Sequence, residues 1–246
     1  MTKDRRTLVL TGASRGIGHA TVAYFMERDW RIITCSRENA PAECRRDTNW
    51  SHHIVADLGE PDGQAGFVRE ITEILGDAPV HALVNNAGVS PKAPFKERLG
   101  CLNGSIDGWR AVFELNFFAP LVLARGVAAA LHRGKGAIVN VTSIAGHATH
   151  PFAGSAYSTS KTALSGLTRE MAVEFAGIGV RVNAVAPGEI ETAMLSPETD
   201  VLIPRIPMGR LGQPKEVAAA IYYLCSEEAG YVTGTELFIT GGQHLF

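Results

Sequence analysis

A glycine-rich turn near the start of the chain separates an apolar run from a helical pattern. The run Arg6 to Leu10 is strand-like, and it breaks into Thr11-Gly-Ala-Ser-Arg-Gly-Ile-Gly18 before a helical pattern over residues 19–28. Glycines in such a turn allow a tight bend, close approach of the backbone to a phosphate and close packing of the helix on the strand. The helix then directs free N–H groups and the positive end of its dipole towards the turn. The order strand, glycine turn, helix therefore indicates a dinucleotide site in an α/β protein.

Short apolar runs alternate with helical patterns along the rest of the chain. The apolar runs lie near residues 7–11, 31–35, 53–56, 80–85, 137–142, 180–186 and 236–240. The helical patterns lie near residues 17–28, 62–75, 107–132, 157–176 and 214–225. Strands that alternate with helices need crossover connections, which give a parallel sheet with helices on both faces. The expected fold class is α/β, a Rossmann-like doubly wound parallel sheet flanked by helices.

We expect residues 1–246 to form a single NAD(P)-binding Rossmann-fold catalytic domain. A chain of 246 residues fits one α/β domain, and no Pro/Ser/Gly-rich linker or block of charge divides it. Its 46% apolar and 20% charged residues are ordinary for a globular protein with a large core.

Charge and hydropathy argue against two classes of partner. The formal net charge of −2 gives no basic field for nucleic acid. The residues Met1 to Arg6 lead into an expected core strand without the apolar segment of a secretory signal, and no stretch is long and apolar enough to span a bilayer. We therefore expect a cytoplasmic protein that binds neither nucleic acid nor membrane.

The cysteines and histidines show no metal-binding pattern. Cys35, Cys44, Cys101 and Cys225 are scattered without a close pair, as expected for reduced, partly buried thiols. His52-His53 is most simply a pair that alternates between the two faces at the start of a strand. We expect no bound metal.

Tyr157 and Lys161 lie four residues apart in Ala156-Tyr-Ser-Thr-Ser-Lys161, within an expected helix. Residues at this spacing are neighbours on one helical face. A fixed cation beside a phenol favours the phenolate and lowers the phenol pKa, which would make Tyr157 an acid/base group. Such a pair is also common on ordinary amphipathic helices, so its meaning depends on the rest of the chain.

Polar residues and turns follow the ends of the other expected strands. Asn85-Asn-Ala-Gly88 ends the fourth strand, Ser143 follows the fifth, and Pro187-Gly188 ends the sixth. Gly12 and Asp57 follow the first and third strands in the same way. Because ligands of such sheets bind outside the carboxyl ends of the strands, one edge of the sheet gathers most of these motifs.

Together with the glycine turn and the Tyr157–Lys161 pair, these segments resemble the classical short-chain dehydrogenase/reductase family. The resemblance covers nearly the whole chain, and it includes Asn116 in a long helix and a last strand within Tyr231 to Gly242. It implies a sheet of about seven strands and an NAD(P)-dependent oxidoreductase that acts on CH–OH groups. It also implies a homo-oligomer, either a homotetramer formed through the two long helices and the C-terminal strand or a dimer.

The resemblance implies a catalytic role for four residues. Tyr157 would give its proton to a carbonyl oxygen as hydride arrives, or take it back from an alcohol. Lys161 would lower the pKa of the tyrosine and bind the nicotinamide ribose. Ser143 would hold the carbonyl oxygen, and Asn116 would bind a water that relays protons towards Lys161. Taken singly, Ser143 could be a turn serine and Asn116 a satisfied helix amide.

The end of the second strand bears on the choice of cofactor. An acidic residue about 20 positions after the glycine turn suits the ribose hydroxyls of NAD, whereas arginine suits the extra phosphate of NADP. Ser36-Arg37 occupies this place, and Arg15 in the turn could close from the other side. We therefore favour NADP(H), while Glu38 directly afterwards keeps NAD(H) open.

The remaining cofactor contacts follow from the resemblance. Asp57 would hold the adenine amine with Leu58 beside it, although a turn-capping Asp is an alternative. The full expected set is Gly12, Ser14, Arg15, Gly16, Ile17, Gly18, Ser36, Arg37, Asp57, Leu58, Asn86, Ala87, Gly88, Tyr157, Lys161, Pro187, Gly188, Ile190 and Thr192.

Three segments depart from the compact family pattern. The loop between Ser143 and Tyr157 is one residue longer than in many relatives and contains His147, His150 and Phe152. Residues 90–106, with Pro91, Pro94, Gly100 and Gly104, also look long, and both segments would shape the rim of the substrate pocket. The segment from Glu189 to Ile206 is consistent with a short lid, or equally with ordinary helix-face residues, through Met194, Leu195, Leu202 and Ile203.

The resemblance is nearest to 3-oxoacyl-acyl-carrier-protein reductases, through Arg210-Leu-Gly212 and Thr233-Gly-Thr-Glu236. An arginine that some of these enzymes use to dock the carrier is replaced here by Gly177-Ile178-Gly179, which leaves Arg133 and Lys135 as candidate contacts.

The expected function is NADPH-dependent interconversion of a carbonyl and a secondary alcohol, on a 3-oxoacyl thioester or a small ketone. One alternative is an NAD-dependent secondary-alcohol or polyol dehydrogenase. A more distant alternative is a regulator that senses dinucleotide without turnover.

Overall fold

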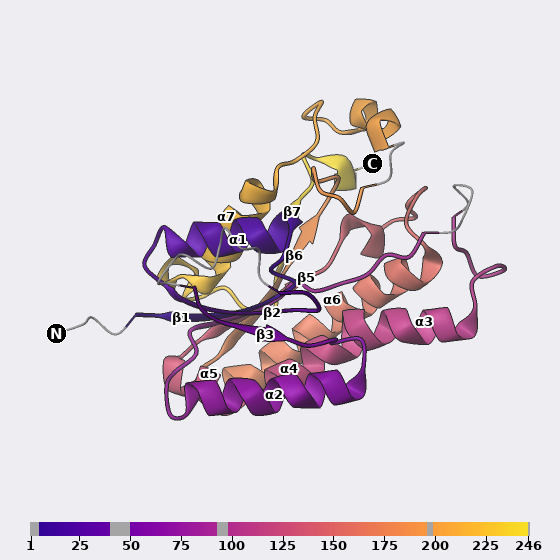
Figure 1. The fold of residues 1–246 in the computed structure, drawn as a ribbon. Coiled ribbons are helices and arrows are strands. Elements are labelled where there is room, and N and C mark those ends of the chain that lie inside the picture. The colour runs from indigo at the N-terminus through magenta and orange to yellow at the C-terminus, as the bar shows by residue number, and fades with distance from the viewer. Residues whose placement is uncertain (1–4, 40–49, 93–97, 196–198, 246) are drawn as a thin grey trace.

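Seven parallel strands form one sheet in the order β3-β2-β1-β4-β5-β6-β7 (Figure 1). The computed structural model describes residues 5–39, 50–92, 98–195 and 199–245. Cys44 and Pro94, considered above, lie outside these ranges. The strands are β1 (Thr7–Thr11), β2 (Arg31–Ser36), β3 (Trp50–Val55), β4 (Ala82–Asn85), β5 (Ala137–Val141), β6 (Arg181–Pro187) and β7 (Glu236–Ile239). The expected Rossmann-like parallel sheet is confirmed.

Helices cover both faces of the sheet. They are α1 (Gly16–Met26), α2 (Pro61–Leu75), α3 (Ile106–Phe113), α4 (Ala119–Gly126), α5 (Ala128–Gly134), α6 (Ser155–Ala176) and α7 (Pro214–Cys225). Figure 1 shows α1 and α7 on one face and α2, α4, α5 and α6 on the other. Because both faces are covered, β1, β4 and β5 are buried along their whole length, as in other parallel sheets.

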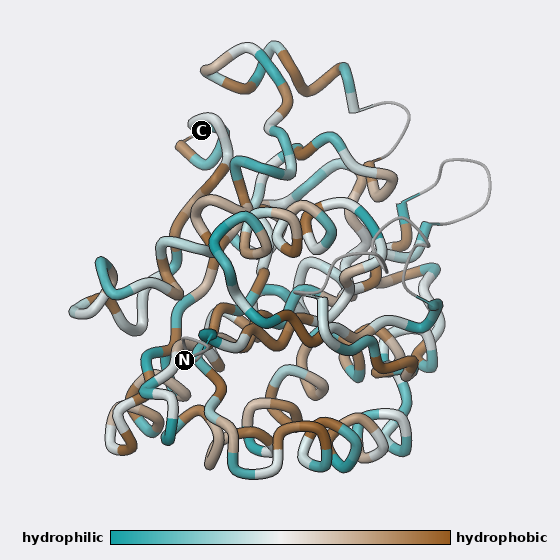
Figure 2. The backbone as a smooth tube through the Cα atoms, turned by 60° about the vertical axis from the view of Figure 1, so that its left-hand side comes forward, coloured by the Kyte–Doolittle hydropathy of each residue, from teal (hydrophilic) through white to brown (hydrophobic). Residues whose placement is uncertain are grey.

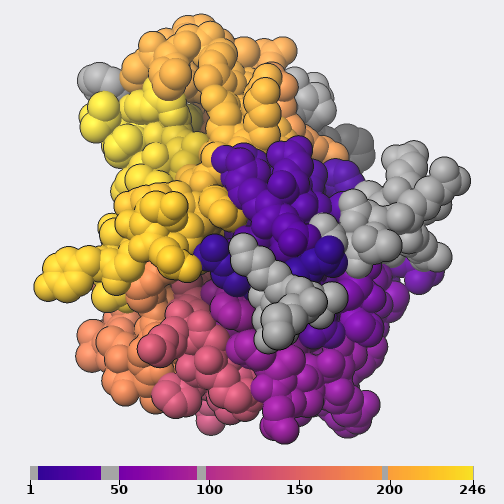
Figure 3. Space-filling view, turned by 90° about the vertical axis from the view of Figure 1, so that its left-hand side faces the viewer, coloured from indigo at the N-terminus to yellow at the C-terminus, as the bar shows by residue number. Residues whose placement is uncertain are grey.

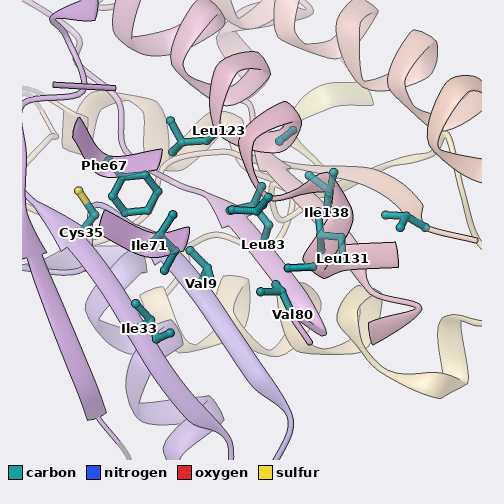
Figure 4. Close-up of a cluster of buried hydrophobic side chains, with 14 of the residues drawn as sticks. Val9, Ile33, Cys35, Phe67, Ile71, Val80, Leu83, Leu123, Leu131 and Ile138 are labelled. Carbon is teal, nitrogen blue, oxygen red and sulfur yellow. The ribbon is translucent and has the colours of Figure 1, made fainter. Parts of the chain in front are cut away.

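Each face of the sheet has its own hydrophobic core. Figure 4 shows Val9, Ile33 and Leu83 of the sheet facing Phe67 of α2 and Leu123 of α4. On the other face, side chains of β1 and β2 meet α1 and α7, where aromatic rings gather around Phe25. The hydrophobic residues are concentrated in the central strands, and hydrophilic residues dominate the outer loops (Figure 2).

The helix expected over residues 107–132 is not continuous. Between α3 and α4 the backbone forms a π-helix, η3 (Glu114–Phe118), in which the N–H of Ala119 bonds to the carbonyl of Glu114. At Val127 the backbone leaves helical geometry, and α5 starts in a new direction. Periodicity of apolar residues does not report such changes of hydrogen-bond register, so the expectation of one helix was wrong here.

The N-terminal and C-terminal parts of the chain lie side by side on one face of the sheet. Figure 3 shows the C-terminal segment packed against α1, in agreement with the contact between α1 and α7. Residues 190–195 and 199–212 lie above the carboxyl ends of the strands, where Ile190 pairs with Gly212 and the short helix η5 (Thr199–Arg205) follows. This segment covers the edge that holds the site.

Within the residues described, no single helix is long and apolar enough to cross a membrane. One bent pair of helices, Ile106–Gly126 with Ala128–Gly134, would be long and apolar enough if both were counted together, by length and composition alone.

Candidate active site

The glycine turn leaves the first turn of α1 open to a ligand. Arg15 is the N-cap residue of α1 and makes no side-chain capping hydrogen bond, and the first turn contains no acidic residue. Gly12 and Gly16 have φ angles of +71° and +57°, which favour glycine. A Cβ atom on Gly18 would lie 2.1 Å from the carbonyl oxygen of Gly12. The turn therefore presents bare backbone and free N–H groups, as a pyrophosphate requires.

Asn86 holds this turn in place from the neighbouring strand. Its Nδ2 donates to the carbonyl oxygens of Thr11 and Gly12, both at 3.0 Å. In return, Thr11 Oγ1 accepts from the backbone N–H groups of Asn86 and Ala87, each at 3.1 Å. These bonds join the ends of β1 and β4, where the strand order reverses. Asn86 therefore acts on the cofactor site through the backbone that it fixes.

A cavity of about 270 Å³ follows the glycine turn along the carboxyl edge. Its walls include Gly12, Ser14, Arg15, Gly16, Ile17, Ser36, Arg37, Glu38, Asp57, Leu58, Asn86, Ala87, Gly88 and Thr192. Among the expected cofactor residues, Gly18 lies behind the turn, and Pro187, Gly188 and Ile190 belong to the adjoining cavity. The uncapped helix, the bare turn and two guanidinium groups fit a bound NAD(P), whose nicotinamide would supply or accept hydride.

The Ser36 side chain is occupied within the protein. Its hydroxyl donates to the carbonyl of Glu38 at 2.6 Å, and His53 Nε2 reaches the same carbonyl at 2.8 Å. His53 Nδ1 in turn lies 2.7 Å from Thr34 Oγ1, which accepts from Trp50 Nε1 at 2.7 Å. The Ser36 hydroxyl therefore already donates within the protein and is not directed at a cofactor phosphate. Arg15 and Arg37 remain as exposed cations on this wall.

His52 and His53 do not stand at the start of a strand. β3 begins earlier, at Trp50, so both lie inside the strand, with His52 exposed and His53 partly buried in the network above.

The position of Asp57 is compatible with both of its alternative roles. Its Oδ1 accepts from the N–H of Gly59 at 2.9 Å, which caps a turn, while the residue lines the cavity beside Leu58.

Ser143, Tyr157 and Lys161 lie in a second cavity, of about 140 Å³, which adjoins the first. Ser143 follows β5 as the N-cap of a short helix, and its Oγ accepts from the N–H of Ala145 at 3.2 Å. The Ser143 hydroxyl lies close enough to the Tyr157 phenol to lower the pKa of that phenol. Five residues line both cavities: Ile17, Asn86, Gly88, Thr192 and Met194.

Lys161 is buried one helical turn beyond Tyr157. It is 4% exposed, and its Nζ donates to the carbonyl of Val141 at 2.7 Å. Nζ lies 5.8 Å from the centre of the Tyr157 ring. A Cβ atom on Gly88 would lie 3.4 Å from Nζ, so a glycine there leaves the ammonium open towards the cavity junction.

The pKa of Tyr157 moves in the direction opposite to our expectation. Burial raises it above its ordinary value, the hydrogen bond from Ser143 lowers it, and the negative charge of Glu189 raises it further. Burial also lowers the pKa of Lys161 to about 8. Burial therefore dominates the pKa of Tyr157 and favours its protonated form.

Asn116 lies in the π-helix, and its side chain is fully buried. Nδ2 donates to Val89 O and Ser160 Oγ, both at 3.0 Å, and Oδ1 accepts from the N–H of Val89 at 2.9 Å. The amide therefore fastens the segment after β4 to α6, which is the satisfied-amide alternative. A relay role for Asn116 stays a prediction.

Two wall residues of the cavity that holds Tyr157 were anticipated only as members of loops near the pocket, without a role of their own. Glu189 directly follows Pro187-Gly188 and is buried, and His150 comes from the loop before α6. Their side chains are hydrogen-bonded to each other. The position of an acidic residue immediately after a strand-end motif was a signal that could have revealed Glu189.

The long loops contribute unequally to the cavity. Ser90, Lys92, His150 and Phe152 line it, whereas His147 instead pairs with Glu236. Of the apolar residues in the suggested lid, Met194 and Leu195 line the cavity, while Leu202 is buried in the protein and Ile203 is partly buried. The first half of the segment, with Met194 and Leu195, is therefore compatible with a lid. Leu202 and Ile203 in the second half are ordinary packed residues.

Arg133 and Lys135 lie far from this edge. Arg133 lies in the last turn of α5 and Lys135 follows that helix just before the start of β5, whereas the cavities lie at the carboxyl ends of the strands. Arg133 donates to the carbonyls of Gly76 and Ala78. The structure therefore does not place these two residues beside the catalytic cavity, as a carrier contact near the pocket would require.

The described residues contain no group of three or more His, Cys, Asp or Glu that could hold a metal ion. Cys35 and Cys225 are buried free thiols, and burial raises the pKa of each to about 12, while Cys101 is exposed.

The family model described as Enoyl-(Acyl carrier protein) reductase matches residues 12–244. With this match and the relatives below, the chain belongs to the classical short-chain dehydrogenase/reductase family. It is an NAD(P)-dependent oxidoreductase that acts on CH–OH groups.

Two curated relatives and one solved structure illustrate the relationship. The chain is 52% identical over 244 residues to Protein FixR of Bradyrhizobium diazoefficiens, with 98% of this chain and 88% of that protein covered. It is 32% identical over 253 residues to the 3-oxoacyl-(acyl-carrier-protein) reductase FabG of Vibrio cholerae, with 100% of both covered. A Brucella ovis oxidoreductase of the same family, solved in complex with a partially ordered NAD, is 47% identical with a TM-score of 0.81, over 96% of this chain and 100% of that one.

Proposed function

We propose that this protein interconverts a small ketone and its secondary alcohol with NADP(H). The observation that carries the proposal is the meeting of Ser143, Tyr157 and Lys161 in one cavity that adjoins the glycine-turn cavity. A carbonyl in the cavity of Ser143, Tyr157 and Lys161 would lie next to a nicotinamide whose dinucleotide fills the glycine-turn cavity. The bound cofactor supplies the hydride, and the side chains supply the proton and the position.

Tyr157 is the proton donor in this proposal. Its raised pKa keeps the phenol protonated at neutral pH, so the proton is available for the oxygen of the reduced carbonyl. Ser143 Oγ, which lines the same cavity as the phenol, holds the same oxygen and stabilises negative charge on it. In the alcohol direction Tyr157 takes the proton back, which requires its phenolate.

Lys161 binds the nicotinamide ribose in this proposal. Among the described residues, Nζ donates one hydrogen bond, to the carbonyl of Val141, and an ammonium carries three donor hydrogens. A ribose hydroxyl near Gly88 and an anionic cofactor would both favour the charged form. Asn116 supports the site by fixing Val89 and Ser160.

Arg37 and Arg15 support NADP(H) over NAD(H). Both guanidinium groups line the cavity at the end of β2, where an adenosine ribose would lie, and guanidinium matches phosphate geometry. Ser36 contributes by shaping the turn that carries Arg37.

NAD(H) is the second candidate cofactor, with a secondary-alcohol or polyol dehydrogenase as the corresponding activity. The Brucella ovis relative, at 47% identity, was solved with NAD. Glu38 lines the same cavity and offers a carboxylate for ribose hydroxyls.

A small ketone is favoured over a carrier-bound thioester as substrate. The likeness to the Vibrio cholerae reductase supports a 3-oxoacyl substrate. The position of Arg133 and Lys135 at the opposite edge argues against carrier docking through them.

We further propose a homotetramer formed through the two long helices and β7. Exposed apolar side chains support this assembly: Phe118 beside α4, Val173 on α6 and Leu237 on the edge strand β7.

Replacement of Tyr157 by Phe tests the function. We expect the variant to lose turnover while its affinity for NADPH stays nearly unchanged, because only the transferable proton is removed. Turnover is followed by the absorbance of reduced nicotinamide on a panel of ketones and alcohols, and affinity by fluorescence titration. Tyr231→Phe is the matched control, since Tyr231 is 105% exposed. Turnover by Tyr157→Phe above a few per cent of wild type would show that the proton comes from another group.

A further inference from the structure

An acidic side chain occupies the wall of the catalytic cavity. Glu189 is 6% exposed and lines the same cavity as Ser143 and Tyr157. It is close enough to Tyr157 for its negative charge to act on the phenol. A buried carboxylate is expensive unless it is paired and hydrogen-bonded, so its presence beside the reacting group needs an explanation.

His150 is neutral and donates a hydrogen bond that fixes the Glu189 carboxylate in place. His150 Nε2 lies 2.5 Å from Glu189 Oε1. Its Nδ1 accepts from the backbone N–H groups of Phe152 and Ala153 at 3.2 and 3.1 Å, so Nδ1 carries no proton. The proton therefore sits on Nε2 and is donated to Glu189. The pair keeps the full negative charge of the carboxylate.

One oxygen of Glu189 is left for a ligand. His150 bonds to Oε1, and Gln243 Nε2 approaches the same oxygen at 3.5 Å. Over the described ranges, no hydrogen bond from the protein reaches Oε2, and Lys161 donates to the carbonyl of Val141 and forms no ion pair with Glu189. Much of the remaining wall is apolar: Ile144, Ala145, Phe152, Ala153, Ile190, Met194 and Leu195.

These surroundings discriminate between substrates. An apolar substituent placed against Glu189 would strip water from the carboxylate and return no hydrogen bond. An anionic substituent would be repelled, whereas a hydroxyl or a protonated amine would satisfy Oε2. A site that hydrogen-bonds a substrate group can reject the analogue that lacks it by large factors.

We propose that Glu189, positioned by His150, selects carbonyl or alcohol substrates that carry a hydrogen-bond donor, a hydroxyl or a protonated amine, near the reacting carbon. The inference rests on the proposed function, because it assumes that the reaction takes place at Tyr157. The volume of about 140 Å³, small beside the roughly 300 to 1,000 Å³ of typical ligand pockets, agrees with a compact polar substrate.

Three ketones of matched size test the proposal: hydroxyacetone, aminoacetone and butan-2-one. We expect wild-type enzyme with saturating NADPH to prefer both donor-bearing ketones over butan-2-one by about tenfold or more in kcat/KM. Glu189→Leu should abolish or invert both preferences. Glu189→Gln keeps an acceptor but loses the charge, so it should weaken the preference for aminoacetone more than that for hydroxyacetone. This difference separates recognition of the hydroxyl from recognition of the ammonium.

Controls separate this inference from the proposed function. The Kd for NADPH should be unchanged in both Glu189 variants, and Tyr157→Phe should stop turnover of all three ketones. Turnover that survives in Tyr157→Phe overturns the proposed function. If wild type prefers butan-2-one, or if Glu189→Leu leaves the preferences unchanged, the inference about Glu189 is overturned while the proposed function stands. If wild type reduces none of the three, saturation-transfer NMR on NADP⁺-loaded enzyme decides, and equal or absent binding of the donor-bearing ketones counts against Glu189.

The positioning role of His150 has a separate readout. His150→Gln can still donate to Glu189, so it should keep the preference for donor-bearing ketones, whereas His150→Leu should raise KM for those ketones and leave KM for butan-2-one unchanged. An equal rise in KM for all three ketones in His150→Leu would indicate that His150 has a merely structural role.

Discussion

At the scale of single residues, burial decides the protonation of the catalytic pair. Tyr157 and Lys161 are both pushed towards their neutral forms, because charge is costly where water is excluded. The spacing of the two residues predicted their proximity correctly, but it predicted the wrong direction for the tyrosine pKa. A spacing rule contains no information about how deeply two side chains are buried.

The low pKa of Lys161 leads to a prediction about stability. Burial lowers the pKa of Lys161 to about 8 from an ordinary value of 10.5, so between these pH values the unfolded chain binds more protons and stability rises with pH. Lys161→Met has no group that titrates at this position. We expect the free energy of unfolding of wild type to gain roughly 1–3 kcal/mol relative to the variant across this window in the absence of cofactor.

Urea unfolding at a series of pH values measures this difference. Titrating groups outside this site contribute equally to both proteins, and the loss of the hydrogen bond to Val141 does not depend on pH. Neither effect changes how the difference in free energy of unfolding between wild type and variant varies with pH. A wild-type-to-variant difference that stays constant from pH 8 to pH 10.5 would mean that Lys161 titrates normally.

Arg37 gives a prediction about cofactor choice. Arg37→Asp replaces the cation on the wall of the adenosine cavity by a carboxylate, which repels a phosphate and accepts from ribose hydroxyls. The ratio of kcat/KM for NADPH over NADH should fall by about tenfold or more, a differential binding energy of about 1.4 kcal/mol. Arg69→Asp, an exposed change on α2, is the control. An unchanged ratio would exclude Arg37 as the phosphate ligand.

At the scale of elements, the site depends on backbone shape as much as on side chains. The glycine turn brings α1 into contact with the end of β1, and Asn86 ties both to β4. The strand, turn and helix here were predictable, because Gly12, Gly16 and Gly18 each meet a distinct steric demand. The π-helix around Asn116 was not, since its register depends on tertiary bonds to Val89 and Ser160.

Gly18→Ala tests the contact between helix and turn. A Cβ atom there would lie 2.1 Å from Gly12 O and 2.6 Å from Asn86 Nδ2, so the turn has to move. We expect a loss of stability of about 2 kcal/mol or more and at least tenfold weaker NADPH binding. Gly66→Ala in α2 is the matched control. Its Cβ would meet only Arg69 Nη2, at 3.8 Å, so it should stabilise the helix by up to about 1 kcal/mol.

Thermal unfolding and fluorescence titration report the two effects. Normal cofactor affinity in Gly18→Ala, with stability unchanged, would show that the turn tolerates a side chain and that its close approach is not needed.

At the scale of the whole molecule, the order of strands and helices followed from the alternation of apolar runs. The pairing of Glu189 with His150 did not, because it joins the end of β6 to a loop about 40 residues away in the sequence and requires tertiary structure to bring them together. Loop residues such as these carry what distinguishes one member of a common fold from another.

The exposed apolar surface leads to a prediction about assembly. Val173 is 78% exposed on α6, one of the two long helices of the proposed tetramer interface. We expect wild type to have a mass near four times the 26.3 kDa of one chain, and Val173→Glu to dissociate into smaller species because a charge would be buried at the interface. Light scattering after size-exclusion chromatography measures both masses. Val55→Glu, on the opposite edge strand β3, is the control, and a wild-type monomer would contradict the proposal.

The wall shared by the two cavities has a consequence for the sequence of events in each turnover. Ile17, Asn86, Gly88, Thr192 and Met194 face both cavities, so a dinucleotide lying along the first would itself form part of the boundary of the second. A ketone that arrived earlier would find that boundary incomplete and would hinder the entry of the nicotinamide end. The geometry therefore favours a compulsory order of binding, in which the dinucleotide enters first and leaves last, so that its departure can limit the rate of the cycle.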